Sequence, residues 1–416
     1  MAITQNIKSW DNLKLFKRST ITSNIYELKS KEYTHVLSEE EVKLHEYRNK
    51  INEYDTKLIN GKNWEYYKKI VNPYELVYTQ KKYDNFPDSV CLLKPLSRSY
   101  FKMIEMLDII NYFNIIKTEN IRAAHVCEGP GGFIEALADE ACRNKKVHTS
   151  IAMTLHSKQT NVPGWSRASR FLQKNRNVRI LYGKDNTGNI MKSENQQYFI
   201  DYCINPSYGG KMNIFTADGG FDFSLDYSKQ EQMIYPLLVA STKIGFEVLK
   251  RGGVFILKIF DFYNKSTIDL LYLLSCHFNE WTLYKPAISR PCNPEQYFIG
   301  KGFLGCSDEI LDVMRLWCNM LDNNQPLNSL LNIEYSEEFK NIIENLRKQS
   351  FNVQTEYLEK VFYIINKNDN DIIKKYLINN EKTSYEWCIR FKVPIFYRRY
   401  HLIAGSHNDQ PISSQQ

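Results

Sequence analysis

The stretch AAHVCEGPGGFIEAL, residues 123–137, contains the transition on which the fold depends. An apolar run that reads as a buried strand ends at Glu128, a glycine-rich turn follows at residues 129–132, and a helical pattern then begins. Glycine lets the backbone turn sharply and approach a ligand without a Cβ in the way. The pattern predicts either a strand–loop–helix unit that holds a nucleotide-like ligand or an ordinary strand-to-helix turn.

The spacing of these glycines narrows the ligand class. It is not the G-x-G-x-x-G of dinucleotide-binding proteins, and no Gly-Lys-Ser/Thr follows that would make the turn a P-loop. The sequence therefore disfavours NAD and ATP.

From about residue 121 to 306, short apolar runs alternate with helical patterns. Each run ends in Gly, Asp or another polar residue, which is typical of strands buried on both faces. Such alternation predicts an α/β fold with a doubly wound, Rossmann-like and largely parallel sheet, whose ligands lie beyond the carboxyl ends of the strands. The predicted strands are AAHVCE, HTSIAMTL, VRILYG, NIFTADGG and GVFILKIFD.

The two ends of the chain have a different character. Residues 1–85 are polar, with one amphipathic helix that begins at the capping box Ser38-Glu39-Glu40-Glu41 and ends near Asn60. Residues 307–416 are mostly helical. We therefore expect three segments: a partly helical extension (1–85), the α/β domain (86–306) and a helical region (307–416).

Composition bounds the protein class. The 416 residues are 43% hydrophobic, and 54 Lys and Arg against 47 Asp and Glu give a net charge of +7, which permits a polyanionic partner without requiring one. The nine cysteines form no C-x-x-C pair, so neither a disulfide framework nor a metal site is predicted. Without a signal pattern or an 18-residue apolar run, we expect a soluble intracellular protein with no membrane partner.

Two charged residues stand at predicted strand ends. Asp218 precedes Gly219-Gly220, an arrangement that is also common in simple turns. Lys258 ends an otherwise apolar strand, so its amine either reaches solvent or lies in a site. In a site, a neighbouring cation would lower its pKa enough for it to act as a base.

The glycine loop, the Asp-Gly-Gly and the strand-end lysine, in this order, resemble the FtsJ/RrmJ-type RNA 2'-O-methyltransferases. The resemblance extends to SRSYFKMIEM (97–106) and SRPCNPEQYFIG (289–300), and covers about residues 89–303. By this resemblance, a catalytic Lys-Asp-Lys-Glu tetrad is carried over onto Lys102, Asp218, Lys258 and Glu295.

The resemblance implies S-adenosylmethionine as the cofactor and a ribose 2'-hydroxyl as the acceptor. The Ser-Arg-Pro and Asp-Gly-Gly motifs are similar to those of the branch of the family that methylates mRNA caps, which includes enzymes of large DNA viruses. A cytoplasmic location is then expected, in the host or the virion for a viral protein, with the nucleus as an alternative. The family's loop usually reads Ala-Pro-Gly-Gly, whereas position 129 here is Gly, which is equally small. The cofactor-binding residues implied are Glu128, Gly129, Pro130, Gly131, Gly132, Phe133 and Asp218.

The expected mechanism makes Lys258 the general base for the ribose hydroxyl, with its pKa depressed by the charge of Lys102. Asp185, after the third predicted strand, either accepts a hydrogen bond from the adenine amino group of the cofactor or forms an Asx turn before Gly188.

RNA contacts are less specific in the sequence. Basic residues are candidates for phosphate contacts and aromatic residues for stacking on a cap guanine, although each also fits a solvated face or a core position. The candidates are Arg290, Lys250-Arg251 and Arg398-Arg399 for phosphate, and Tyr208, Trp64, Tyr66 and Tyr67 for stacking.

Alternatives stay open at this point. The acceptor could be the first transcribed nucleotide of capped mRNA, or an rRNA or tRNA, and other capping or transcription proteins are conceivable partners. An inactive RNA-binding scaffold with the same fold is a further reading. Asn205-Pro206-Ser207-Tyr208 resembles the Asn-Pro-Pro-Tyr loop of adenine-N6 methyltransferases, but the strand end where that loop belongs is occupied by Asp218.

Overall fold

The computed structural model describes residues 9–20, 37–51, 53–54, 57–79, 86–156, 164–220, 230–323 and 335–396. Its internal packing divides the chain into two compact units, each assembled from segments distant in the sequence. The larger unit comprises Ile7–Thr56 and Pro95–Glu359; the smaller comprises Met1–Asn6, Lys57–Lys94 and Lys360–Gln416.

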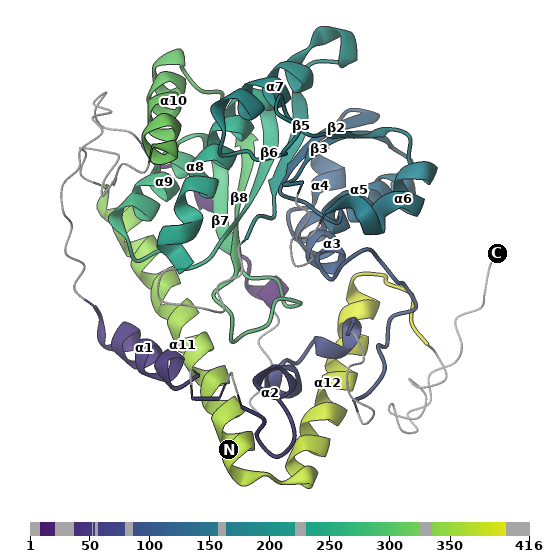
Figure 1. Cartoon of the computed structure of the whole chain (residues 1–416), viewed down its shortest axis with the longest axis vertical. Helices are drawn as coiled ribbons and strands as arrows, with labels where there is room; N and C mark the ends of the chain where they lie inside the picture. Colours follow the sequence, from purple (N-terminus) through teal and green to yellow (C-terminus); the bar gives the residue numbers. More distant parts are fainter. Residues whose placement is uncertain are drawn as a thin grey trace. The chain divides into compact units, whose positions relative to one another are not determined.

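The described strands of the larger unit form one eight-stranded sheet, in the order β1-β7-β8-β6-β5-β2-β3-β4 (Figure 1). Neighbours from β4 to β6 pair in parallel, and β8 lies antiparallel between β6 and β7. The doubly wound α/β fold predicted from the sequence is confirmed. The strands are β1 (Phe16–Lys17), β2 (Asn120–Val126), β3 (Val147–Met153), β4 (Val178–Leu181), β5 (Met212–Ala217), β6 (Leu249–Ile259), β7 (Phe278–Tyr284) and β8 (Gln296–Phe303).

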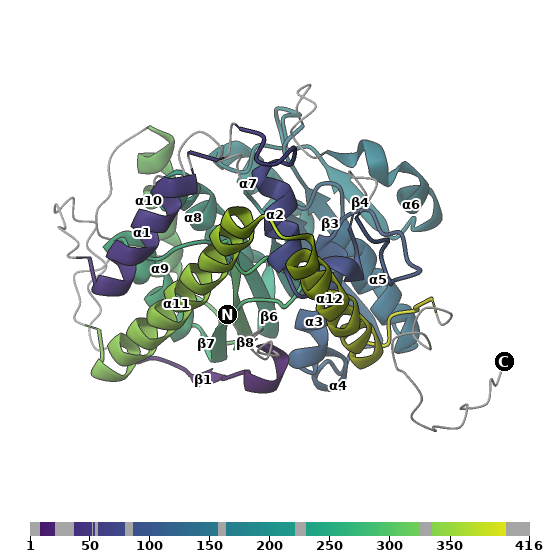
Figure 2. The ribbon, with the colours of Figure 1, turned by 90° about the horizontal axis from the view of Figure 1, so that it is seen from below.

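Helices cover both faces of this sheet. Helices α8 and α9 lie on one face, and α3 and α5 on the other (Figure 2). Because helices shield both faces, the central strands β2 and β5 are buried almost throughout. The helices of this unit are η1 (Ser9–Asn12), α1 (Glu39–Ile51), α3 (Ser99–Ile109), α4 (Tyr112–Ile115), α5 (Gly132–Arg143), η3 (Trp165–Ala168), α6 (Ser169–Lys174), α7 (Ser193–Ile204), η4 (Pro206–Tyr208), α8 (Gln230–Val248), α9 (Lys265–Cys276), α10 (Asp308–Asp322) and most of α11 (Glu337–Lys367).

Strand register brings the carboxyl ends of the central strands to one level. Val126 of β2 pairs with Ala217 of β5, and Ala217 pairs with Leu257 of β6. Ile259, at the end of β6, pairs with Gln296 at the start of the antiparallel β8. The residues that follow β2 and β5, and the one that precedes β8, therefore meet at the same edge of the sheet.

The predicted amphipathic helix in the N-terminal segment exists as α1 but is shorter than expected. Its capping box is formed: the backbone N–H of Ser38 donates to Glu41 (2.6 Å) and that of Glu41 donates to the Ser38 hydroxyl (3.3 Å). The helix ends at Ile51. The later part of the predicted span instead forms a turn at Asn60-Gly61, both with positive φ, closed by the bridge between Ile59 and Lys62.

The smaller unit joins pieces from both terminal segments. It contains α2 (Trp64–Val71), η2 (Glu75–Val77), the end of α11 and α12 (Asn370–Arg390). The ring of Trp64 packs against Phe362 (5.5 Å), and Asn380 donates to the carbonyl of Ile70 (2.7 Å). This packing differs from the expected consecutive division at residues 85 and 306, because apolar faces far apart in the sequence cover each other. Among the described residues, no helix has both the length and the apolar character needed to cross a lipid bilayer.

Candidate active site

Four charged side chains meet where β5 and β6 end and β8 begins. Asp218 directly follows β5, Lys258 is the penultimate residue of β6, Glu295 directly precedes β8, and Lys102 lies on α3. The amine of Lys102 pairs with Glu295 (2.6 Å) and that of Lys258 pairs with Asp218 (3.1 Å). The structure thus brings together the tetrad expected from the sequence, although the four residues are spread over nearly 200 positions of the chain.

Further hydrogen bonds fix the two acids. The hydroxyl of Tyr297 donates to Asp218 (2.8 Å), and that of Ser289 donates to Glu295 (2.8 Å). Burial favours the neutral form of Glu295, but the charges of Lys102 and Lys258 and these short contacts hold its pKa well below the ordinary value. Glu295 is therefore a permanent anion of the site.

The expected depression of the Lys258 pKa is wrong. Burial alone would lower it, but the negative charges of Asp218 and Glu295 outweigh burial, so the pKa of Lys258 is raised above its ordinary value. Lys102 has its own acid partner, Glu295, and its charge is neutralised at close range. In this arrangement Lys258 is a protonated amine at neutral pH.

The glycine loop connects β2 to α5. Gly131 has φ +106°, which residues with side chains rarely adopt. A Cβ on Gly132 would lie 2.2 Å and 2.3 Å from the hydroxyls of Ser99 and Ser97, and 2.9 Å from the backbone nitrogen of Tyr100. Glycine at position 132 is thus required by the close packing of α5 against the start of α3.

Glu128, just before the loop, is buried, and only one of its two carboxylate oxygens has a hydrogen-bond partner among the described residues. Its Oε1 accepts a hydrogen bond from Thr216 (2.6 Å), whereas Oε2 has no partner in the described part of the chain. Burial, followed by the charge of Asp218, raises the pKa of Glu128 well above its ordinary value. A cationic hydrogen-bond donor at Oε2 would satisfy this atom and stabilise the carboxylate.

Two other expected cofactor contacts have structural partners already. The side chain of Phe133 is fully buried and packs against the Tyr297 ring (5.8 Å), so only its backbone remains for a ligand. Asp185 forms the Asx turn that was one of its two readings, accepting from the Thr187 backbone N–H (2.9 Å) and from Lys192 (2.6 Å). These bonds, the Lys192 bond first, lower the pKa of Asp185. Its contact with an adenine group stays a prediction.

Tyr208, one of the expected stacking residues, lies at the opposite end of β5 from the tetrad. Tyr208 precedes β5 and Asp218 follows it, so the six residues of this strand, roughly 20 Å, separate the two. Trp64, Tyr66 and Tyr67 are core residues of the smaller unit. Aromatic residues are common in cores, so their presence in the sequence carried little information. Of the basic candidates, Arg290 is partly buried beside Ser289, Lys250 and Arg251 are exposed near the start of β6, and Arg398 and Arg399 lie outside the described residues.

One residue of the site was missed. Lys285 follows β7, and its amine donates to the backbone carbonyls of Asn293 (2.5 Å) and Glu295 (2.9 Å). Burial lowers its pKa to about 8, against the opposing charge of Glu295. The signal that found Lys258, an apolar strand ending in lysine, is also present in WTLYK (281–285). Lys285 fastens the backbone that carries Glu295.

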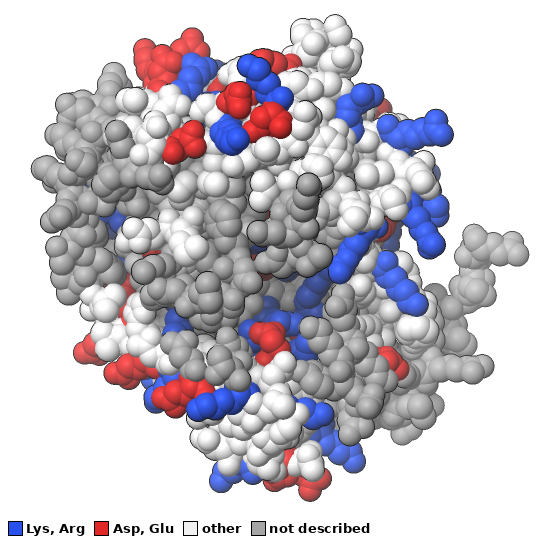
Figure 3. Space-filling model, viewed as in Figure 1, with Lys and Arg blue, Asp and Glu red and all other residues white. Residues whose placement is uncertain are grey.

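An exposed basic surface was missed as well. Basic residues recur every two to four positions around α6, and Figure 3 shows Lys and Arg side chains gathered over this region with few acids nearby. Their spacing in WSRASRFLQKNRNVR was visible in the sequence. The exposed basic residues there are Arg167, Arg170, Lys174, Arg176 and Arg179.

Comparisons with known proteins agree with this geometry. Residues 95–303, half of the chain, match the model of the FtsJ-like methyltransferase family. The cap-specific mRNA (nucleoside-2'-O-)-methyltransferase 1 of Dictyostelium discoideum is 34% identical over 221 residues, 50% of this chain and 29% of that protein. The corresponding methyltransferase 2 of Danio rerio is 30% identical over 209 residues, 49% of this chain and 28% of its own.

A third relative, the methyltransferase 1 of Mus musculus, is 29% identical over 250 residues, which is 57% of this chain and 29% of that protein. The chain thus spans less than a third of the length of these curated relatives. The family match contains all four residues of the tetrad and the glycine loop. The chain belongs to the FtsJ-like methyltransferase family.

Proposed function

We propose that this protein transfers a methyl group from S-adenosylmethionine to a ribose 2'-hydroxyl of RNA, at the first transcribed nucleotide of capped mRNA. The observation that carries the proposal is the pair of ion pairs, Lys102–Glu295 and Lys258–Asp218, at the carboxyl-end edge of the sheet. The names of the relatives support capped mRNA as the substrate class. The exposed basic residues around α6 suit a polyanionic substrate.

The residues present fit the cofactor. The unsatisfied Oε2 of the buried Glu128 suits an ammonium donor, and Asp218 places a second carboxylate close by. Gly131 and Pro130 leave the loop without long side chains. When bound, S-adenosylmethionine would supply the methyl group on a positively charged sulfur.

Within this proposal, Lys258 accepts the proton of the ribose hydroxyl. Because its pKa is raised, only a minor fraction of the amine is neutral at pH 7, so the rate should rise with pH up to that pKa. Lys102 and Glu295 hold the geometry, and Lys285 holds the backbone of Glu295. Alignment of hydroxyl and methyl group removes much of the entropic cost of the reaction.

The test is transfer of label from S-adenosylmethionine to a short capped RNA, beside the same RNA already 2'-O-methylated at its first nucleotide. We expect label only on the unmodified RNA, and a loss of about 10³-fold in Lys258→Ala. Lys375→Ala, an exposed lysine on α12, serves as the matched control and should keep full activity. Label on both RNAs would place the methyl group elsewhere. Cofactor binding without transfer to any RNA would instead favour the inactive scaffold.

A further inference from the structure

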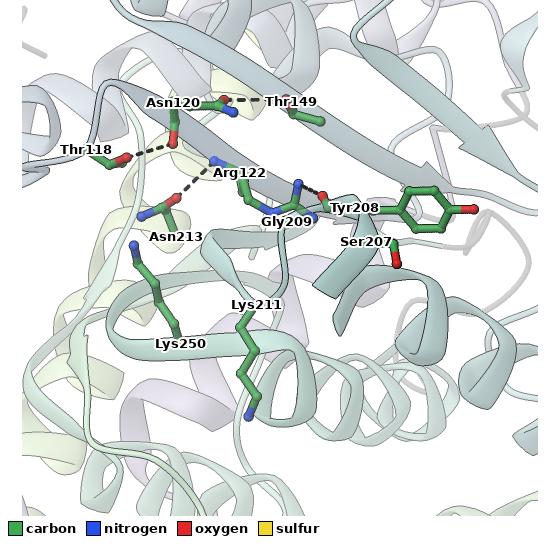
Figure 4. A pocket seen from close by; sticks show the side chains of 10 residues that line it. All are labelled: Thr118, Asn120, Arg122, Thr149, Ser207, Tyr208, Gly209, Lys211, Asn213 and Lys250. Atoms are coloured by element: carbon green, nitrogen blue, oxygen red, sulfur yellow. Dashed lines mark hydrogen bonds between the residues drawn. The ribbon is translucent and has the colours of Figure 1, made fainter. Parts of the chain in front are cut away.

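A cavity of about 640 Å³ lies at the amino-end edge of the sheet, opposite to the tetrad. Its lining comes from the first residues of β2, β3, β5 and β6, from η4 and from the turn that follows η4 (Figure 4). Three lining residues are cations, Arg122, Lys211 and Lys250, and none of the described lining residues is acidic. This charge distribution favours an anionic ligand.

Two buried side chains of this cavity have N–H groups without acceptors. Arg122, 9% exposed, donates through Nη1 to the carbonyl of Tyr208 and through Nε to that of Gly210 (3.0 Å), while Nη2 has no partner in the described part of the chain. Asn213, 2% exposed, accepts the Arg122 backbone N–H (2.9 Å), and its Nδ2 has no partner among the described residues either. Buried donors of this kind are rare without a ligand or ordered water.

No carboxylate among the described lining residues of the cavity balances the charge of Arg122. Burial lowers the pKa of its guanidinium, and buried guanidinium groups in proteins are normally paired with carboxylate or phosphate. In Figure 4 the Lys250 side chain points toward Asn213, whereas Lys211 and the phenol ring of Tyr208 point away. Asn213 and Lys250 therefore offer N–H donors to one ligand. The guanidinium of Arg122 is turned toward Tyr208 and adds its positive charge to the cavity.

We propose that this cavity is a second ligand site, which takes a phosphate group. The phosphate oxygens accept from Asn213 Nδ2 and from the Lys250 amine, and Arg122 contributes its charge. The site goes beyond the proposed methyl transfer and does not depend on it, since the length of β5 separates it from the tetrad. The phosphate belongs either to a small free compound or to the backbone of the RNA.

The experiment is calorimetric titration of the full chain with inorganic phosphate at constant ionic strength. Asn213→Asp keeps an acceptor for the Arg122 backbone N–H but replaces the donor amide with a carboxylate, and Lys250→Glu reverses an exposed charge. Each should weaken phosphate binding by about tenfold or more. The control Lys375→Glu should bind like the wild type. Thermal unfolding establishes that all variants are folded.

Equal phosphate binding by all four proteins would mean that phosphate is an adventitious ion only, and would overturn the proposal. Absence of phosphate binding by the wild type would also overturn it. Fluorescence anisotropy with a short RNA then separates the two sources. A loss of RNA affinity in Lys250→Glu beyond that of Lys375→Glu assigns the phosphate to RNA, and an unchanged RNA affinity assigns it to a free compound. Lys258→Ala should bind phosphate like the wild type, because the cavity does not include the tetrad. Failure of the proposed methyl transfer would therefore leave this test unaffected.

Discussion

The two edges of the same sheet differ in how their charged side chains are paired. At the carboxyl-end edge, two lysines are matched by two acids in direct ion pairs. At the amino-end edge, Arg122 and two lysines face a cavity with no acid among its described lining residues. A compensated cluster suits a reaction in which a proton moves between fixed groups, whereas an uncompensated one suits a ligand that brings its own negative charge.

The largest loss of methyl transfer is expected when one of the ion pairs at the carboxyl-end edge is broken. Glu295→Gln removes the partner of Lys102 and one of the charges that raise the pKa of Lys258. Methyl transfer should fall by about 10²-fold. The rise of activity with pH should also end at a lower pH, because the neutral amine forms more easily.

A pH–rate profile checks this prediction, with Glu337→Gln on the exposed start of α11 as the control for the substitution itself. An unchanged profile in Glu295→Gln would mean that the charge of Glu295 does not act on the base.

The second prediction concerns Lys285, whose buried amine holds the backbone at Glu295 but lowers the stability of the fold where that amine is charged. Its folded-state pKa of about 8 lies below its ordinary value, so the unfolded chain binds more protons between about pH 8 and 10. The free energy of unfolding should therefore rise with pH in this window, by up to about 3 kcal/mol, and lose that gain as pH falls to 8.

Denaturant unfolding of wild type and Lys285→Met at several pH values measures this dependence as a difference. The variant should show the flatter profile and reduced methyl transfer, since the bonds to Asn293 and Glu295 are lost. Parallel profiles would show that the amine of Lys285 titrates normally.

The smallest effect concerns backbone packing at the same edge. Gly132→Ala forces a Cβ toward Ser97, Ser99 and the backbone of Tyr100, and should lower the free energy of unfolding by about 1–3 kcal/mol. Gly164→Ala is the matched control, because, apart from its chain neighbours, no atom of the described residues lies within 4 Å of where its Cβ would be, and its φ is negative. Denaturant unfolding that finds both variants equally stable would show that α5 and α3 can move apart without loss of free energy of unfolding.

Much of the active-site edge could be predicted because its signals are local. Asp218 and Lys258 mark strand ends, and the register of a parallel sheet carries strand ends to one edge. Lys102 and Glu295 were accessible only by resemblance, because no local pattern says that a helix residue and the start of an antiparallel strand lie near that edge. The role of Tyr208 in stacking stays a prediction; it lies at the opposite end of β5 from Asp218.

The alternation of apolar runs and helices in the sequence determined the α/β class, and the glycine loop determined where the helix after β2 begins. Tertiary structure alone decided the protonation of Lys258, because a pKa depends on the nearest charges in space and here the nearest are two carboxylates. It also decided that pieces of both terminal segments form one unit, and that Arg122 and Asn213 line a cavity whose described lining residues include no acid. Burial and charge pairing depend on distances between residues far apart in the sequence, which no local pattern encodes.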